Sequence, residues 1–243
     1  MDLQGRVALV TGAGRRLGRA IAVALGRRGA RVAVHFNDAS TGAEETAAMI
    51  RAAGGEARTF GADLSDAAAA GALVNTVADT FGAFDVLINS AGIMERHPVS
   101  EVTPEMWDRT FAINLRSQFF TSQAAAPRMP DRGGVIVNMA DLAGFEAWTA
   151  YVAHSVSKAG VVALTRALAH ALAPRVRVNA IAPGAVLLPE HWDKAQADHL
   201  IATTPLKHLG SPDDVVRTVE FLIDSEYITG ETVIVDGGRH VRS

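Results

Sequence analysis

The chain has 243 residues, 49 % of them hydrophobic and 20 % charged, and its 23 basic and 26 acidic side chains leave a net charge of −3. This composition is typical of a soluble protein, and the length suits a single α/β domain over residues 1–243. Cysteine is absent, which excludes disulfides and thiolate metal sites. The slight acidity argues against nucleic-acid or membrane partners, because both require a basic face.

No stretch reaches about 18 uninterrupted apolar residues, and the first residues contain no apolar core of a signal peptide. No repeat or low-complexity linker divides the chain. We therefore expect a cytoplasmic protein whose partner is a small-molecule substrate.

Short β-branched segments alternate with longer helical patterns along the whole chain. The expected strands are Val7–Val10, Arg31–Phe36, Ala57–Phe60, Asp85–Asn89, Val135–Met139, Arg177–Ile181 and Thr232–Val235. The expected helices lie near residues 16–28, 41–53, 66–80, 104–126, 150–173 and 212–224. This alternation predicts an α/β fold with one doubly wound, Rossmann-type parallel sheet and helices on both faces. In such sheets ligands bind beyond the carboxyl ends of the strands.

A glycine-rich turn joins the first strand to the first helix. Glycines there let the backbone turn tightly and approach a pyrophosphate, which then lies on the amides of the helix N-terminus. The candidate cofactor contacts are Gly12, Arg15, Arg16, Leu17 and Gly18.

This turn resembles the cofactor loop of the short-chain dehydrogenase/reductase family, which usually has Gly where Arg16 stands. The arginine version resembles the pteridine reductase branch, in which the matching arginine helps hold the 2′-phosphate of NADPH. The resemblance covers residues 5–238 and continues at Asp63, Leu64, Asn89, Ala91, Gly92, Asn114, Pro183, Gly184 and residues 228–238. It implies NADPH/NADP+ as the cofactor and a homotetramer paired through the helices near 104–126 and 150–173.

The end of the second strand bears on the choice of cofactor. NAD-selective sites place a carboxylate there for the ribose 2′-hydroxyl, and that carboxylate would repel a 2′-phosphate. In this chain Phe36, followed by Asn37, occupies the position at which NAD-selective sites have the carboxylate. We expect Arg16 and His35 to face the phosphate, with Ser40 as a further donor. If the Asp38 side chain pointed into the site, its negative charge would weaken a preference for NADPH over NADH.

The helix near 150–173 contains His154 and Lys158, four positions apart and thus on one helix face. In the family this region reads Tyr-x-x-x-Lys. The tyrosine is the general acid/base, and the lysine binds the nicotinamide ribose and lowers the tyrosine pKa. Lys158 matches the family, but His154 replaces the tyrosine. A histidine titrates near neutral pH without help; the alternative is that it fills a site that has lost proton transfer.

Asp141 stands where most family members have a serine that polarises the substrate carbonyl. Pteridine reductases also carry Asp at this position. The thirteen positions between Asp141 and His154 equal the family interval, so the histidine is not a register error.

Four other residues complete the expected site. Asn114 resembles the family asparagine that anchors a water in the proton relay. Tyr151, seven positions before Lys158, is an alternative acid or a packing residue. Val186 and Trp192 fall in an expected substrate lid over about residues 185–205. The histidines show no metal spacing, and we expect no metal.

The first functional hypothesis is hydride transfer from NADPH to a C=N bond in a cyclic imine or pterin-like substrate. Asp141 suits a cationic substrate, and an iminium needs no proton from a tyrosine. The second hypothesis is a carbonyl reductase or alcohol dehydrogenase with His154 as the acid/base. The third is a catalytically silent NADPH-binding protein.

Overall fold

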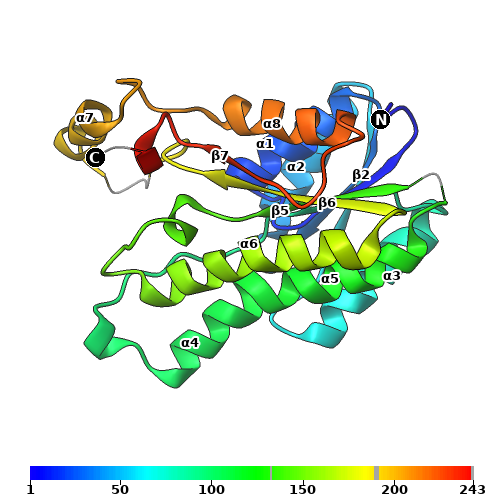
Figure 1. Cartoon of the computed structure of the whole chain (residues 1–243). Helices are drawn as coiled ribbons and strands as arrows, with labels where there is room; N and C mark the ends of the chain where they lie inside the picture. The colour runs from blue at the N-terminus through cyan, green and yellow to red at the C-terminus, as the bar shows by residue number, and fades with distance from the viewer. Residues whose placement is uncertain (132, 189–191, 242–243) are drawn as a thin grey trace.

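The computed structural model describes residues 1–131, 133–188 and 192–241 of the chain. Seven parallel strands form one sheet in the order β3-β2-β1-β4-β5-β6-β7, with helices on both faces (Figure 1). The predicted α/β fold with a Rossmann-type sheet is confirmed.

The strands are β1 (Val7–Val10), β2 (Arg31–Phe36), β3 (Glu56–Gly61), β4 (Val86–Asn89), β5 (Gly134–Met139), β6 (Val176–Pro183) and β7 (Thr232–Val235). The helices are α1 (Arg16–Arg27), α2 (Ser40–Ala52), α3 (Ala67–Phe81), α4 (Pro104–Phe111), α5 (Ser117–Ala125), α6 (Val152–Leu172), α7 (Lys194–Thr203) and α8 (Pro212–Asp224).

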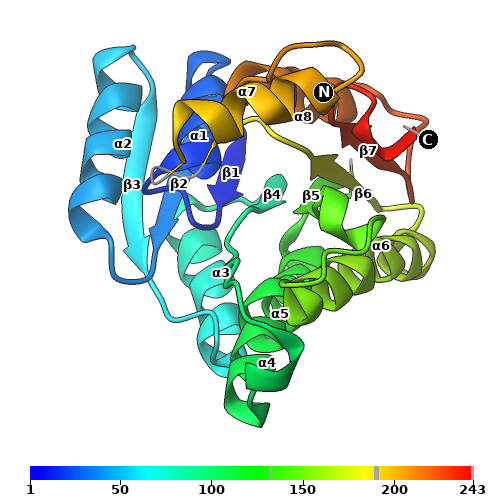
Figure 2. The same ribbon diagram turned by 90° about the vertical axis from the view of Figure 1, so that its left-hand side faces the viewer.

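Helices cover both faces of the sheet (Figure 2), and an apolar layer of side chains holds them against each face. Side chains of α1, α2 and α8 pack on one face, and those of α3, α5 and α6 pack on the other. The central strands β1, β4 and β5 are buried throughout, as expected when helices cover both faces. In the described part of the chain, no helix is long and apolar enough to cross a membrane.

Two helical features differ from the expectation. The helix expected near 104–126 is interrupted by a π-helical turn, Ala112–Arg116, which separates α4 from α5. Helix α7 lies in the expected lid, where no helix was predicted; residues 189–191 of that lid lie outside the described residues. Its N-terminus is fixed by a capping box between Asp193 and Gln196.

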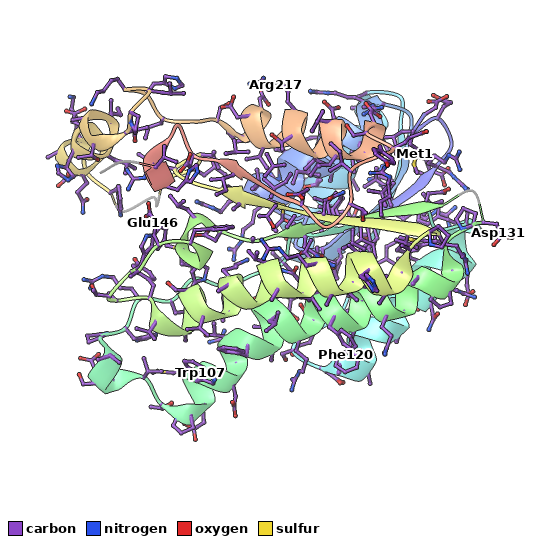
Figure 3. All side chains as sticks on the ribbon, in the orientation of Figure 1. Met1, Trp107, Phe120, Asp131, Glu146 and Arg217 are labelled. Atoms are coloured by element: carbon purple, nitrogen blue, oxygen red, sulfur yellow. The ribbon has the colours of Figure 1, made fainter. Side chains whose placement is uncertain are left out.

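The strand order reverses between β1 and β4, which opens a crevice at their carboxyl ends. In Figure 3, Glu146 and Trp107 lie toward this end of the molecule, whereas Asp131, just before β5, lies at the opposite end. The segments that carry the expected cofactor and catalytic residues therefore meet at one edge of the sheet.

Candidate active site

The turn after β1 is as tight as the sequence predicts. Gly12 has φ +65°, and a Cβ there would lie 2.9 Å from the Ala91 Cα. A Cβ on Gly18 would lie 2.4 Å from the Gly12 carbonyl oxygen. The turn thus packs directly on the chain after β4, and only glycine fits at these two positions.

This turn borders a cleft of about 400 Å³. The cleft is lined by Gly12, Gly14, Arg15, Arg16, Leu17, Gly18, His35, Phe36, Asn37, Asp38, Ala39, Asp63, Leu64, Ser90, Ala91, Gly92, Ile93, Arg109 and Ile113. No side chain among the described residues caps the N-terminus of α1, so its first amides are available to an anion. A glycine-lined turn, a free helix N-terminus and a long cleft fit a dinucleotide.

His35 has different bonding partners from the one expected. It is 2 % exposed; its Nδ1 accepts a hydrogen bond from the Gly12 N–H at 3.0 Å, and its Nε2 lies 3.0 Å from the Ala62 carbonyl oxygen. This pattern requires the neutral ring with the proton on Nε2, and burial lowers the pKa of His35. His35 lines the cleft as expected, but both of its ring nitrogens are engaged in supporting the glycine turn, so neither is free to bind a 2′-phosphate.

Two arginines remain at that end of the cleft. Arg15 and Arg16 are both exposed, and the Arg16 Nη2 donates to the Leu187 carbonyl oxygen at 3.2 Å. Arg16 has φ +51°, a left-handed conformation that explains why glycine is usual at this position. Asp38 also borders the cleft, whereas Ser40 begins α2 and is not among the lining residues.

Asp63 and Leu64 line the cleft beyond β3. The Asp63 carboxylate accepts a hydrogen bond from the Ser65 N–H at 2.9 Å, which lowers the pKa of Asp63. Arg109 of α4 also reaches the cleft and forms an ion pair with Glu95 at 3.0 Å. The sequence patterns did not single out Arg109, Gly14, Ala39, Ser90, Ile93 or Ile113 as cofactor contacts. Gly14, Ser90, Ile93 and Ile113 had a signal, since they lie within or beside the recognised motifs, whereas Arg109 had none.

Asn89 is not among the residues that line the cleft; its side chain joins the segments that form the base of the cleft. It is 1 % exposed, and its Nδ2 donates to Asn138 Oδ1 at 2.9 Å and to Ser122 Oγ at 3.2 Å. Its Oδ1 accepts from Thr121 Oγ1 at 2.8 Å. These bonds tie the end of β4 to α5 and β5.

Asn114, in the π-helical turn, connects the cleft to the catalytic residues. Its Oδ1 accepts from the Ile93 N–H at 2.8 Å, and its Nδ2 donates to the Ile93 carbonyl oxygen at 2.9 Å and to Ser157 Oγ at 3.1 Å. A Cβ on Gly92 would lie 3.3 Å from the Asn114 Oδ1 and 3.6 Å from the Lys158 Nζ. Gly92, Asn114 and Lys158 therefore meet at one point.

His154 is held from one side of its ring. Its Nδ1 lies 3.0 Å from the Ile93 carbonyl oxygen and 3.4 Å from the Asn114 Nδ2; the shorter contact is to an acceptor, so the geometry favours the tautomer that carries its proton on Nδ1. Its Nε2 has no hydrogen-bond partner among the described residues, although the side chain is only 4 % exposed. In the neutral ring this Nε2 is a buried acceptor in need of a donor.

Asp141 follows β5 and faces this free nitrogen. Its Oδ1 accepts from the Ala143 N–H at 2.8 Å, and its Oδ2 lies 3.7 Å from the His154 Nε2. The Asp141 side chain is 24 % exposed, so it remains accessible to a substrate.

Lys158 lies one helical turn after His154 and is 6 % exposed. Its Nζ donates to the Met139 carbonyl oxygen at 2.8 Å. Burial lowers the pKa of Lys158, and the nearby Asp141 carboxylate opposes this shift.

The remaining expected residues lie around the edge of this arrangement. Tyr151 is the N-cap residue of α6 and contacts Trp148 with its ring, 5.9 Å between centroids. Val186 is 9 % exposed and packs in the core, and Trp192 lines a shallow hollow along α7. Pro183 ends β6, and a Cβ on Gly184 would lie 2.7 Å from the Asp236 Cβ, so Gly184 permits a close approach of two chain segments. Neither Pro183 nor Gly184 lines the cleft described above.

Comparison with known proteins places this geometry in a family. The family model described as "Enoyl-(Acyl carrier protein) reductase" matches residues 12–240. The D-threitol dehydrogenase of Mycolicibacterium smegmatis is 40 % identical, over 99 % of this chain and 95 % of that protein. Versicolorin reductase stcU of Emericella nidulans is 36 % identical, over 97 % of this chain and 96 % of that protein.

Solved structures show the same fold. FolM alternative dihydrofolate reductase 1 from Brucella canis, complexed with NADP, superposes with a TM-score of 0.94 at 32 % identity, over 100 % of this chain and 96 % of that one. A blue fluorescent protein from a metagenomic library, in complex with NADPH, gives a TM-score of 0.91 at 33 % identity, over 98 % and 99 %.

The chain belongs to the short-chain dehydrogenase/reductase family and is an oxidoreductase that uses a nicotinamide dinucleotide.

Proposed function

We propose that the protein is an NADPH-dependent reductase that transfers hydride to the C=N bond of a cyclic imine or pterin-like substrate. The observation that carries this proposal is the pair of acceptor atoms in the site, the free Nε2 of His154 and the Oδ2 of Asp141, 3.7 Å apart. By the resemblance to the family, this ring nitrogen, which has no hydrogen-bond partner among the described residues, stands in place of a tyrosine hydroxyl.

The proton arrangement favours a substrate that brings its own N–H. The His154 Nδ1 proton is donated to Ile93, so the neutral ring offers only an acceptor at Nε2. Asp141 adds a negative charge beside it. A protonated imine supplies both the donor and the opposite charge that these two groups lack. When bound, the reduced nicotinamide supplies the hydride. The product amine leaves neutral, and no side chain has to give up a proton.

The preference for NADPH rests on charge at one end of the cleft. Arg15 and Arg16 border it, and Phe36 stands where an NAD-selective site has a carboxylate. Two neighbours, the FolM reductase and the blue fluorescent protein, were solved with NADP and NADPH. Asp38 opposes the preference, and the two guanidinium groups outweigh its single charge.

A carbonyl reductase or alcohol dehydrogenase is the second candidate. The observation in its favour is the same His154–Asp141 distance, which also suits an ion pair with a protonated ring. An imidazolium would donate Nε2–H to a carbonyl oxygen, and relatives include a D-threitol dehydrogenase and a 3-oxoacyl-[acyl-carrier-protein] reductase.

NADPH oxidation with matched substrates tests the proposal. The probes are 1-pyrroline and cyclopentanone, a cyclic imine and a ketone of the same ring size. The proposal predicts a larger kcat/KM for the imine, with a rate that falls when the pH exceeds the pKa of the iminium. Faster turnover of the ketone favours the second candidate. NADPH binding without turnover of a broader panel of imines, ketones and pterins supports the silent NADPH-binding alternative.

We also propose a homotetramer that pairs through α5 and α6. Each of these helices leaves a large apolar side chain exposed, Phe119 at 37 % and Val156 at 45 %. A monomeric mass by light scattering at micromolar concentration would refute this assembly.

A further inference from the structure

A buried glutamine lies beneath Lys158, outside the residues that the sequence singled out. Gln118 in α5 is 1 % exposed. Its Nε2 donates to the Asn114 carbonyl oxygen at 3.0 Å and approaches the Met139 carbonyl oxygen at 3.4 Å. The same Met139 oxygen accepts the Lys158 ammonium at 2.8 Å. One carbonyl oxygen thus joins the glutamine to the lysine.

Packing alone does not account for a glutamine at this position. Its Oε1 has no hydrogen-bond partner among the described residues, and a buried acceptor without a partner is unfavourable. A methionine or leucine would fill a similar volume without that cost. The donor at Nε2 is the feature that an apolar side chain cannot replace.

The two carbonyl groups that Gln118 contacts belong to the segments that carry the site. Asn114 lies in the π-helical turn, and Met139 ends β5, two residues before Asp141. Lys158 is buried, so its ammonium depends on oriented carbonyl dipoles rather than on bulk water. The Gln118 Nε2 lies between the two carbonyl groups. It therefore fixes the orientation in which the Met139 carbonyl oxygen accepts the Lys158 ammonium.

We infer that Gln118 is a positioning residue that holds Lys158 for the cofactor, its side-chain amide taking a place that a buried water would otherwise fill between the carbonyl groups of Asn114 and Met139. The inference rests on the proposed function only in that Lys158 binds the nicotinamide ribose.

The test measures NADPH dissociation constants by fluorescence for Gln118→Met and Gln118→Ala. Methionine keeps the length but removes the donor and excludes water, so we expect NADPH affinity to fall about tenfold. Alanine leaves room for a water that donates to the same two oxygens, so affinity falls less. Thermal stability should rank the other way, because alanine leaves the larger cavity. If Gln118 only filled space, the variant with the lower melting temperature would also have the lower NADPH affinity, so opposite rankings are not expected of a packing residue.

Two further arms separate positioning from general damage. Thr165→Val removes the hydroxyl that accepts from Asn138 Nδ2 at 3.0 Å, a buried bond elsewhere on α6, and should lower the melting temperature with unchanged NADPH affinity. In a Lys158→Met background, Gln118→Met should have no further effect on NADPH affinity. A crystal structure of Gln118→Ala should show a water bonded to the Asn114 and Met139 carbonyl oxygens.

The inference is overturned if Gln118→Met leaves NADPH affinity unchanged, if Gln118→Ala binds as weakly as Gln118→Met, or if the loss persists without Lys158. Should Gln118→Met fail to fold, absence of the water in Gln118→Ala overturns it. These readouts need no substrate, so failure of imine reduction in the wild type would refute the proposed function separately.

Discussion

The His154 Nε2 and the Asp141 Oδ2 lie 3.7 Å apart, beyond hydrogen-bond distance but within the range of an ion pair. Because the His154 Nδ1 donates to the Ile93 carbonyl oxygen, the opposite nitrogen faces the carboxylate without a proton in the neutral ring. Under the proposed function, these two neighbouring acceptors favour a substrate that donates a hydrogen bond. This relationship distinguishes the site from one in which a tyrosine hydroxyl supplies the proton.

Introducing a tyrosine by His154→Tyr should raise ketone reduction and add little to imine reduction. A phenol beside Lys158 is a general acid, and such catalysis is worth roughly 100- to 10,000-fold. An iminium is already protonated and gains nothing from it. The measurement is kcat/KM for cyclopentanone and 1-pyrroline with NADPH saturating. His170→Tyr, on an exposed position of α6, is the control. An equal gain for both substrates would contradict the iminium mechanism.

Arg16→Gly should weaken NADPH binding about tenfold and leave NADH binding nearly unchanged. The guanidinium is expected to contact the 2′-phosphate, and charge-assisted hydrogen bonds contribute about 1.5–3 kcal/mol. Glycine suits the left-handed backbone at this position, φ +51°, so the fold should not suffer. Isothermal titration with both cofactors measures the effect, with Arg27→Ala at the far end of α1 as control. Equal losses of affinity for NADPH and NADH would show that Arg16 does not bind the 2′-phosphate.

Gly18→Ala should lower the melting temperature and abolish tight cofactor binding. The added Cβ would lie 2.4 Å from the Gly12 carbonyl oxygen, so the turn after β1 must move. Gly71→Ala in α3 is the matched control, since a Cβ there meets nothing within 4 Å. That variant should be as stable as the wild type or more stable by up to about 1 kcal/mol. Normal NADPH binding by Gly18→Ala would refute the described turn geometry.

His35 should make the fold less stable at acidic pH. Burial lowers the pKa of His35 in the folded protein, so below about pH 6.5 the unfolded chain binds a proton that the folded chain does not. Unfolding then becomes easier by up to about 1.4 kcal/mol for each pH unit until the lowered folded pKa is reached. His35→Gln keeps an acceptor and a donor without titrating. Urea unfolding at several pH values should show a shallower acid slope for that variant, and an unchanged slope would contradict the buried neutral histidine.

Most of the sheet was predictable because its strands are continuous apolar runs. Val7–Val10 and Thr232–Val235 have their expected bounds. The structure also brings together Asp141, His154 and Lys158, which the resemblance had singled out; their roles stay predictions. Parallel strands place their carboxyl ends at one edge, so sequence order was sufficient to bring the motifs together.

Other features depend on contacts that no short pattern encodes. His35 lies next to the end of β2, where a polar residue is common, and only the fold shows its ring bonded to Gly12 and Ala62. In the sequence, Gln118 is an ordinary polar residue of a helix. Only the structure shows that the π-helical turn and β5 each place a carbonyl group at its side-chain amide. Helix α7 was missed because its segment shows only a weak amphipathic pattern. The helix is instead fixed at its N-terminus by the capping box.

We propose that the negative charge of Asp141, rather than a proton from His154, promotes reduction of the C=N bond. The measurement is kcat/KM for 1-pyrroline, with NADPH saturating, for Asp141→Asn and His154→Phe. Asparagine keeps the Oδ1 that accepts from Ala143 but removes the charge, which for this partly exposed group is worth on the order of 2 kcal/mol, or about thirtyfold. We expect Asp141→Asn to lose more activity than His154→Phe. A larger loss for His154→Phe would contradict it and identify the histidine as the acid.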